Sequence, residues 1–150
     1  MKKAFTIIEL IFVIVILGIL SAVALPKFAT TKNLADVSKA RSDVAAIRSS
    51  ILTERQSQLI KGNIIDPYIP KLSENSTLFT GVGVRKLLRY GIVEGSTDGK
   101  WSADDTGYKK YTFHSDSKTI SFEYDSSDGT FNCITHNTGD DLVICKKIVN

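Results

Sequence analysis

Hydrophobic positions are concentrated at the start of the chain. The 23 residues from Ala4 to Pro26 contain one charged side chain, Glu9. Lys2 and Lys3 precede this segment, and Lys27 follows it. A surface helix of a cytosolic domain keeps a polar face, whereas this segment is apolar on every side. The pattern therefore excludes an ordinary cytosolic domain.

The apolar segment has two interpretations. From Phe5 to Leu25 it would form about 31 Å of helix at ~1.5 Å per residue, close to the ~30 Å hydrocarbon core of a bilayer. It could thus be a retained membrane helix with its lysines on the cytoplasmic side, or a secretory signal peptide cut after Ala24. Glu9 favours a retained helix, because a discarded signal has no use for a carboxylate. An ionisable group at the bilayer centre costs roughly 3 kcal/mol, and the cost is smaller for Glu9 because it lies near one end of the segment.

The first residues also resemble a known family. The run Lys2-Lys3-Ala4-Phe5-Thr6-Ile7-Ile8-Glu9-Leu10 resembles the prepilin signature of type IV pilins and type II secretion pseudopilins. The resemblance implies that a prepilin peptidase cuts between Ala4 and Phe5 on the cytoplasmic side and N-methylates Phe5. Ala4 stands where the family usually has glycine. Gly18 and Pro26 match the recurring positions at which the family's helix is weakened.

The resemblance also implies how copies assemble. Cleavage leaves an ammonium group on Phe5 inside a bundle of apolar helices. Glu9 of a neighbouring copy can pair with it, so that neither charge is left alone in a dry interior. We therefore expect Thr6, Glu9, Gly18 and Pro26 to serve assembly.

The helix is expected to continue to Lys61, with a kink at Pro26, which lacks a backbone donor. Apolar residues spaced three or four apart predict one helical face against the chain's own globular region: Leu34, Val37, Ala40, Val44, Ile47 and Ile51. Gly62-Asn63 is a typical helix stop. A short helix is predicted for residues 84–90.

Alternating residues and turn formers predict four strands, at 108–114, 119–125, 129–135 and 141–149. They would form an antiparallel meander covered by the long helix, an α+β lollipop that is also the fold implied by the resemblance. The expected divisions are a leader at 1–4, a transmembrane and assembly helix at 5–26, its amphipathic continuation at 27–62 and a globular periplasmic head at 63–150.

The candidate chemistry is sparse. Cys133 and Cys145 are the two cysteines, and in an oxidising compartment a disulfide between them is the default. A zinc site that adds His136 would lack a clear fourth ligand. No catalytic set stands out, so an enzyme is not expected and no cofactor is implied. Aspartates in turns offer a weak case for calcium: Asp98, Asp104, Asp105, Asp125, Asp128, Asp140 and Asp141.

Charge is divided unevenly along the polar part of the chain. Residues 30–93 carry ten basic and five acidic side chains, whereas residues 94–145 carry four basic and ten acidic ones. The interpretations are two solvated faces of unlike sign, or copies packed head to tail. The net charge of +1 for residues 30–150 gives no nucleic-acid signal.

These observations predict a structural subunit of a type IV filament. It would wait in the inner membrane with its head in the periplasm and then join the filament. Its expected partners are other copies or related pilins, the prepilin peptidase, the inner-membrane assembly platform and membrane lipid. The alternatives are a pseudopilin of type II secretion or DNA uptake, or a periplasmic binding module released by cleavage after Ala24.

Overall fold

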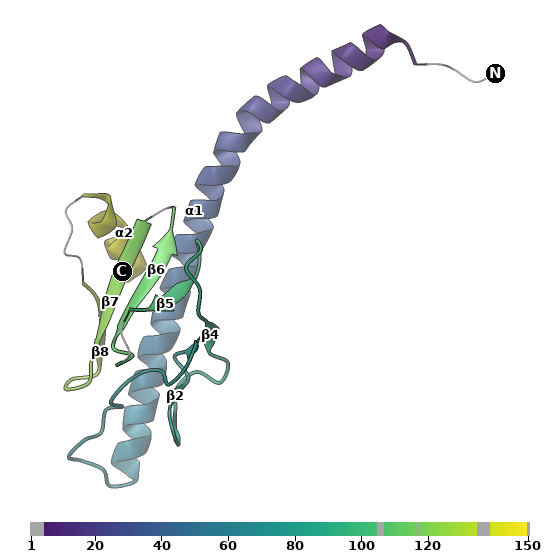
Figure 1. Ribbon diagram of the computed structural model, residues 1–150. Coiled ribbons are helices and arrows are strands. Elements are labelled where there is room, and N and C mark those ends of the chain that lie inside the picture. The colour runs from purple at the N-terminus through teal and green to yellow at the C-terminus, as the bar shows by residue number, and fades with distance from the viewer. Residues whose placement is uncertain (1–4, 105–106, 117, 135–138, 150) are drawn as a thin grey trace. The chain divides into compact units, whose positions relative to one another are not determined.

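The computed structural model describes residues 5–104, 107–116, 118–134 and 139–149, with the side chain of residue 140 left out. The chain divides into two compact units, Met1–Ala35 and Asp36–Asn150. The first unit contains the beginning of the long helix α1, which spans Ile7–Ile60. The second unit, here called the head, contains the rest of α1, all the strands and a second helix (Figure 1). The long helix predicted from Phe5 to Lys61 is therefore confirmed.

The helix α1 ends at a glycine cap. Gly62 has a φ of +84°, its amide donates to the Leu59 carbonyl at 3.0 Å, and the Asn63 amide donates to the Gln58 carbonyl at 3.0 Å. This pair of bonds is the Schellman motif, in which a left-handed glycine satisfies carbonyls that the last turn leaves open. The stop predicted at Gly62-Asn63 is confirmed.

The head contains a four-stranded antiparallel sheet in the order β5-β6-β7-β8. The strands span Trp101–Ala103, Lys110–Ser115, Lys118–Asp125 and Thr130–Cys133, respectively. Two smaller antiparallel pairs precede it: β1 (Thr77–Leu78) with β4 (Ile92–Val93), and β2 (Gly81–Val82) with β3 (Arg85–Lys86). Three of the four predicted strands are found, and the α+β class is confirmed.

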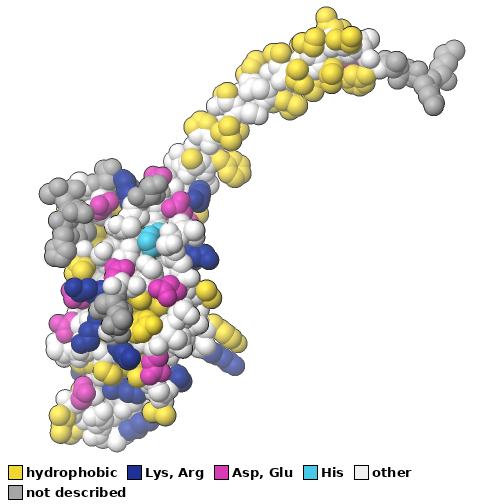
Figure 2. Space-filling view, in the orientation of Figure 1, with side chains coloured by type: hydrophobic (Ala, Val, Ile, Leu, Met, Phe, Trp, Pro, Cys, Tyr) yellow, Lys and Arg dark blue, Asp and Glu magenta, His cyan; other side chains and the backbone are white. Residues whose placement is uncertain are grey.

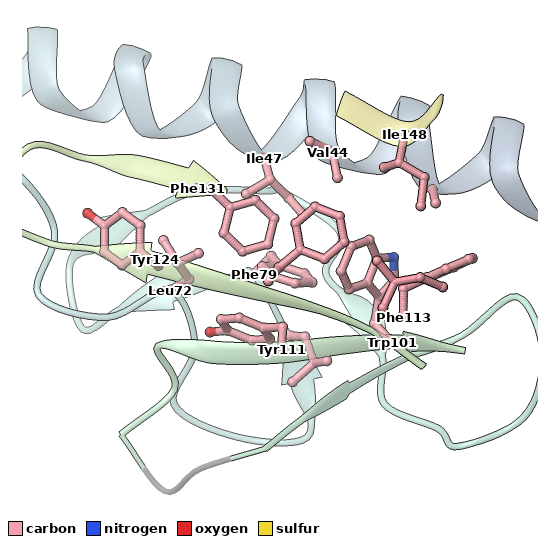
Figure 3. Close-up of a cluster of buried hydrophobic side chains, with 14 of the residues drawn as sticks. Val44, Ile47, Leu72, Phe79, Trp101, Tyr111, Phe113, Tyr124, Phe131 and Ile148 are labelled. Carbon is pink, nitrogen blue, oxygen red and sulfur yellow. The ribbon is translucent and has the colours of Figure 1, made fainter. Parts of the chain in front are cut away.

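The sheet and the second half of α1 enclose one aromatic core. Ala40, Val44, Ile47 and Ile51 face inward from the helix, as their spacing predicted. Seven buried rings come from the strands and from the loop after β1: Phe79, Trp101, Tyr111, Phe113, Phe122, Tyr124 and Phe131 (Figure 3). Phe79 lies among them, with ring centroids 4.5 Å from Tyr111 and 5.7 Å from Trp101.

The register of the sheet explains the inward rings. Phe113 faces Ile120, and Tyr124 faces Phe131 across adjacent strands. Because side chains alternate between the two faces of a strand, these residues share the face that packs against α1. The sheet therefore has one buried face, as expected of an antiparallel meander.

Two predicted elements are wrong. Residues 141–149 form a helix rather than a strand, α2 (Asp140–Val149). Cys145 and Ile148 are its buried residues, and their spacing of three fits a helical face. Residues 84–90 form no helix; β3 lies within them and pairs with β2. Leu34, expected on the buried face of the long helix, is 60% exposed.

Candidate functional site

Two of the candidate assembly residues lie at the start of α1: Thr6 precedes the helix and Glu9 is in its first turn. Glu9 Oε2 accepts hydrogen bonds from the Thr6 amide at 2.9 Å and from the Thr6 hydroxyl at 2.8 Å. The Glu9 amide in turn donates to Thr6 Oγ1 at 3.3 Å. This reciprocal arrangement is a capping box, which satisfies amides that the start of a helix leaves without partners. The spacing Thr-x-x-Glu is the signal for this motif in the sequence, although the predictions did not include it.

Large apolar side chains of the first unit are exposed along α1. Phe5, Ile8 and Phe12 are 77%, 76% and 66% exposed, and Figure 2 shows hydrophobic side chains along this length of helix. By length and composition, α1 is able to cross a membrane. An apolar surface of this extent needs lipid or other protein around it.

Gly18 lies in the middle of this apolar segment. A Cβ added there would have no neighbour within 4 Å. Glycine inside a helix costs about 1 kcal/mol relative to alanine, and the chain gains no internal packing in return. Pro26 also lies inside α1, and Thr30 Oγ1 donates to its carbonyl at 3.2 Å. Glycine and proline both disfavour a helix interior; that these two positions serve assembly stays a prediction.

The structure brings together only part of the predicted site. Thr6 and Glu9 are in contact, and Phe5 precedes them with 77% of its surface exposed. Ala4, on the other side of the predicted cleavage point, lies outside the described residues. The assembly and cleavage roles therefore stay predictions.

A disulfide joins Cys133 to Cys145, with their Cα atoms 6.2 Å apart. It ties the end of β8 to the middle of α2, so the predicted pairing is confirmed even though Cys145 lies on a helix. The alternative zinc site is not supported by this pairing, and His136 lies outside the described residues. The bridge fixes a C-terminal helix that has a single face against the core.

The described parts of the chain contain no group of three or more His, Cys, Asp or Glu side chains placed to hold a metal ion. Several of the turn aspartates have local partners instead. Asp125 Oδ1 accepts from the Ser127 amide at 2.8 Å, and Asp128 Oδ1 accepts from the Thr130 amide at 2.8 Å. Hydrogen bonds from Ser127 lower the pKa of Asp125. Asp105 and the side chain of Asp140 lie outside the described residues.

An ion pair links α1 to the β2–β3 hairpin. Arg85 Nε and Nη2 donate to the two Glu54 carboxylate oxygens, each at 2.8 Å. Arg85 Nη2 also donates to the Pro67 carbonyl at 2.7 Å, and Gln58 Nε2 donates to Glu54 Oε1 at 2.7 Å. The Glu54 side chain is only 5% exposed. No pattern in the sequence predicts this pair, because its members lie on different elements 31 residues apart.

Two further hydrogen bonds link α1 to the sheet. Trp101 Nε1 donates to Asp43 Oδ2 at 2.9 Å, and burial raises the pKa of Asp43 despite this bond and the charge of Lys39. Arg48 Nε donates to the Phe131 carbonyl at 3.0 Å. The head is thus held to its helix by polar bonds as well as by the aromatic core.

Comparison with known proteins agrees with the N-terminal signature. Residues 1–25 match the model of the prokaryotic N-terminal methylation motif. A fimbrial protein of Pseudomonas aeruginosa is 34% identical over 93 residues, which are 57% of this chain and 58% of that protein. A fimbrial protein of Moraxella nonliquefaciens is 45% identical over 56 residues, 37% of this chain and 36% of that protein.

A secretion protein is also similar. Type II secretion system core protein G of Dickeya chrysanthemi is 40% identical over 50 residues, which cover 33% of each chain. No solved structure gives a significant match. The matched region spans 58% of the length of the Pseudomonas relative.

The fold and these matches make the chain similar to type IV pilins and type II secretion pseudopilins. Its features are a prepilin-type methylation motif, a long apolar N-terminal helix and an antiparallel sheet that packs on that helix. The predicted resemblance to type IV pilins and type II secretion pseudopilins is confirmed.

Proposed function

We propose that this chain is a structural subunit of a type IV filament. The observation that supports this function best is the methylation motif, whose match at residues 1–25 includes the start of an apolar helix with exposed side chains. In a membrane, lipid would cover that helix. In a filament, the helices of other copies would cover it instead, and the polar heads would remain outside.

A processing step would precede assembly. Prepilin peptidase would remove residues 1–4 and methylate the amine of Phe5. The chain would wait as a single-pass protein of the inner membrane, with its head in the periplasm. The disulfide between Cys133 and Cys145 supports this location, since such bonds persist in oxidising compartments.

Glu9 would then have two roles. Within its own chain it completes the capping box with Thr6. Between chains, its carboxylate would pair with the ammonium group of Phe5 on a neighbour and set the axial register of the subunits. Gly18, which has no packing role in its own chain, would let neighbouring helices approach closely.

Two substitutions separate these roles. Glu9→Gln keeps a side chain that can complete a capping box but removes the charge, whereas Glu9→Ala removes both. The proposal expects both variants to lose filaments while Phe5 is still exposed by cleavage. Glu123→Ala is the control and should assemble, because this carboxylate lies on the outer face of the sheet, half-buried and 4.0 Å from the Lys110 ammonium group. Wild-type filament levels and spacing in Glu9→Gln would show that the charge is not used.

A pseudopilin of type II secretion is the second candidate, favoured by the match to core protein G. The disulfide-closed C-terminal region favours a pilin instead. Deletion of the gene distinguishes the two. Loss of surface filaments with normal protein secretion indicates a pilin, and the opposite result indicates a pseudopilin. A mature chain that begins at Leu25 would indicate a secreted binding module and refute both.

A further inference from the structure

A groove opens between the end of α1 and the β2–β3 hairpin. Its volume is about 610 Å³, and hydroxyl-bearing residues of α1 form much of its lining, among them Ser50 and Ser57. Glu54 and Arg85 also line it, but each neutralises the other. The groove is also lined by two exposed lysines, Lys61 and Lys86.

The two lysines give the groove lining a net positive charge, because its other charged members, Glu54 and Arg85, form an ion pair. Neither ammonium group has an ion-pair or hydrogen-bond partner among the residues that the structure describes. Val84, between the hairpin strands, lines the same groove and is 95% exposed. A partner that fits this groove would therefore be acidic, with some apolar surface beside the charge.

An unmatched carboxylate lies at the opposite end of the head. Asp116 follows β6, is exposed and has a φ of +51°. Its carboxylate, too, has no partner within the described parts of the chain. The local structure places it near the first residues of the head, because the Gly99 amide donates to the His114 carbonyl at 2.8 Å and Gly99 lies against Asp36.

The chain cannot bring these charges together by itself. Asp36 and Lys61 are separated by about 37 Å of helix at ~1.5 Å per residue. Figure 1 shows the end of β6 and the β2 region at opposite ends of the head. A contact between Asp116 and the groove therefore needs a second molecule.

We infer that the groove between α1 and the β2–β3 hairpin receives Asp116, the residue that follows β6, of a second copy, with its carboxylate between Lys61 and Lys86. This inference rests on the proposed filament function. Copies that assemble with their helices pointing the same way bring opposite ends of their heads together. A contact between two different surfaces is heterologous, so it can repeat along an open filament instead of closing into a dimer.

Carbodiimide cross-linking tests the contact directly. The reagent joins a carboxylate to an amine with no spacer, so a bond between Asp116 and Lys61 or Lys86 must come from two molecules. Peptide mass spectrometry of wild-type filaments, grown with an equal mixture of ¹⁴N- and ¹⁵N-labelled subunits, should find this bond with mixed labels. Filaments that form without this cross-link would overturn the inference.

Charge reversal tests whether the contact matters. Lys61→Glu/Lys86→Glu should lower the yield of filaments by roughly tenfold or more, since it places like charges face to face. Adding Asp116→Lys to that double variant should restore most of the yield. Lys146→Glu/Lys147→Glu, an equal change on α2 away from the groove, should assemble. Normal yield in the groove variant, or no rescue, would overturn the inference.

Two controls keep this result separate from the proposed function. Every variant should still be cleaved before Phe5 and show a normal melting temperature for the head. If the wild type forms no filaments, the filament function fails. The same cross-linking on full-length protein in membranes then decides the contact. If 50 mM inorganic phosphate protects both lysines from acetylation on monomeric protein and no cross-link forms, the groove binds small anions and the inference is wrong.

Discussion

Loss of the Arg85 side chain should destabilise the head, because it leaves a buried carboxylate without its ion-pair partner. Arg85→Met keeps much of the side-chain length but removes three donated hydrogen bonds, two to Glu54 and one to the Pro67 carbonyl. The Glu54 carboxylate, 5% exposed, would keep only the bond from Gln58 at 2.7 Å. Leaving one member of a buried ion pair alone typically costs about 3–5 kcal/mol.

That loss is a large share of the ~5–15 kcal/mol by which a typical domain is stable. In urea, a slope of about 1.5 kcal/mol per molar converts it into a midpoint lower by roughly 2–3 M. Trp101 is the single tryptophan of the chain and is fully buried. Its fluorescence in detergent-solubilised, disulfide-intact protein therefore reports unfolding of the head.

Two further variants make the test specific. Arg89→Met is the control, because Arg89 is exposed and lies over Tyr90 at the surface; it should cost less than about 1 kcal/mol. Glu54→Leu/Arg85→Met removes both charges and should recover much of the loss, since no buried charge then remains unpaired. A cost below ~1 kcal/mol for Arg85→Met, or a double variant less stable than the single one, would refute this reasoning.

Three other predictions concern the head. Burial raises the pKa of Asp43 above the ordinary value of 3.8 for an aspartate. The free energy of unfolding of the wild type should therefore fall relative to that of Asp43→Asn as pH rises above 3.8. Parallel pH–stability curves for the two proteins would contradict this. Cys133→Ser/Cys145→Ser should lower the free energy of unfolding by about 3 kcal/mol, and urea melts that match those of the wild type would show that the bridge is dispensable. Gly81→Ala should be less stable than Gly83→Ala by ~1 kcal/mol or more. Both glycines have positive φ, but only at Gly81 would the new Cβ lie 2.1 Å from a carbonyl oxygen across the hairpin; equal urea midpoints would count against it.

The parts of the fold that the sequence predicted correctly are those with a local signal. The inward spacing of Val44, Ile47 and Ile51 identified the buried face of α1. Alternation in residues 119–125 identified β7, in which Ile120 and Phe122 are buried. In both elements the spacing of apolar residues stays constant for several residues, because one face of the element is buried and the other is exposed.

The errors occurred where short apolar runs fit two periods. The run Leu142-Val143-Ile144 suggested a strand, but helical spacing buries Cys145 and Ile148 beyond it. Residues 84–90 suggested a helix, although Gly83 with its φ of +54° begins a tight turn there. Tertiary contacts decide such segments, and a single sequence does not contain them.

The candidate site divides in the same way. The N-terminal signature occupies consecutive positions, so the sequence alone could identify it. The groove with Lys61 and Lys86, and the ion pair beneath it, depend on elements that come together only in the fold. Head-to-tail packing was one interpretation of the uneven charge along the chain. The groove and Asp116 are the surfaces on which this interpretation can be tested.

The most direct test of the central claim is the intact mass of the chain purified from membranes of cells that express a prepilin peptidase. The account predicts a chain of 146 residues, from 150 minus the four of the leader, that begins at Phe5 and carries one methyl group on its amine. N-terminal fragmentation would locate that methyl group. A mature chain that begins at Leu25, or one that still begins at Met1 while the peptidase is active, would contradict it.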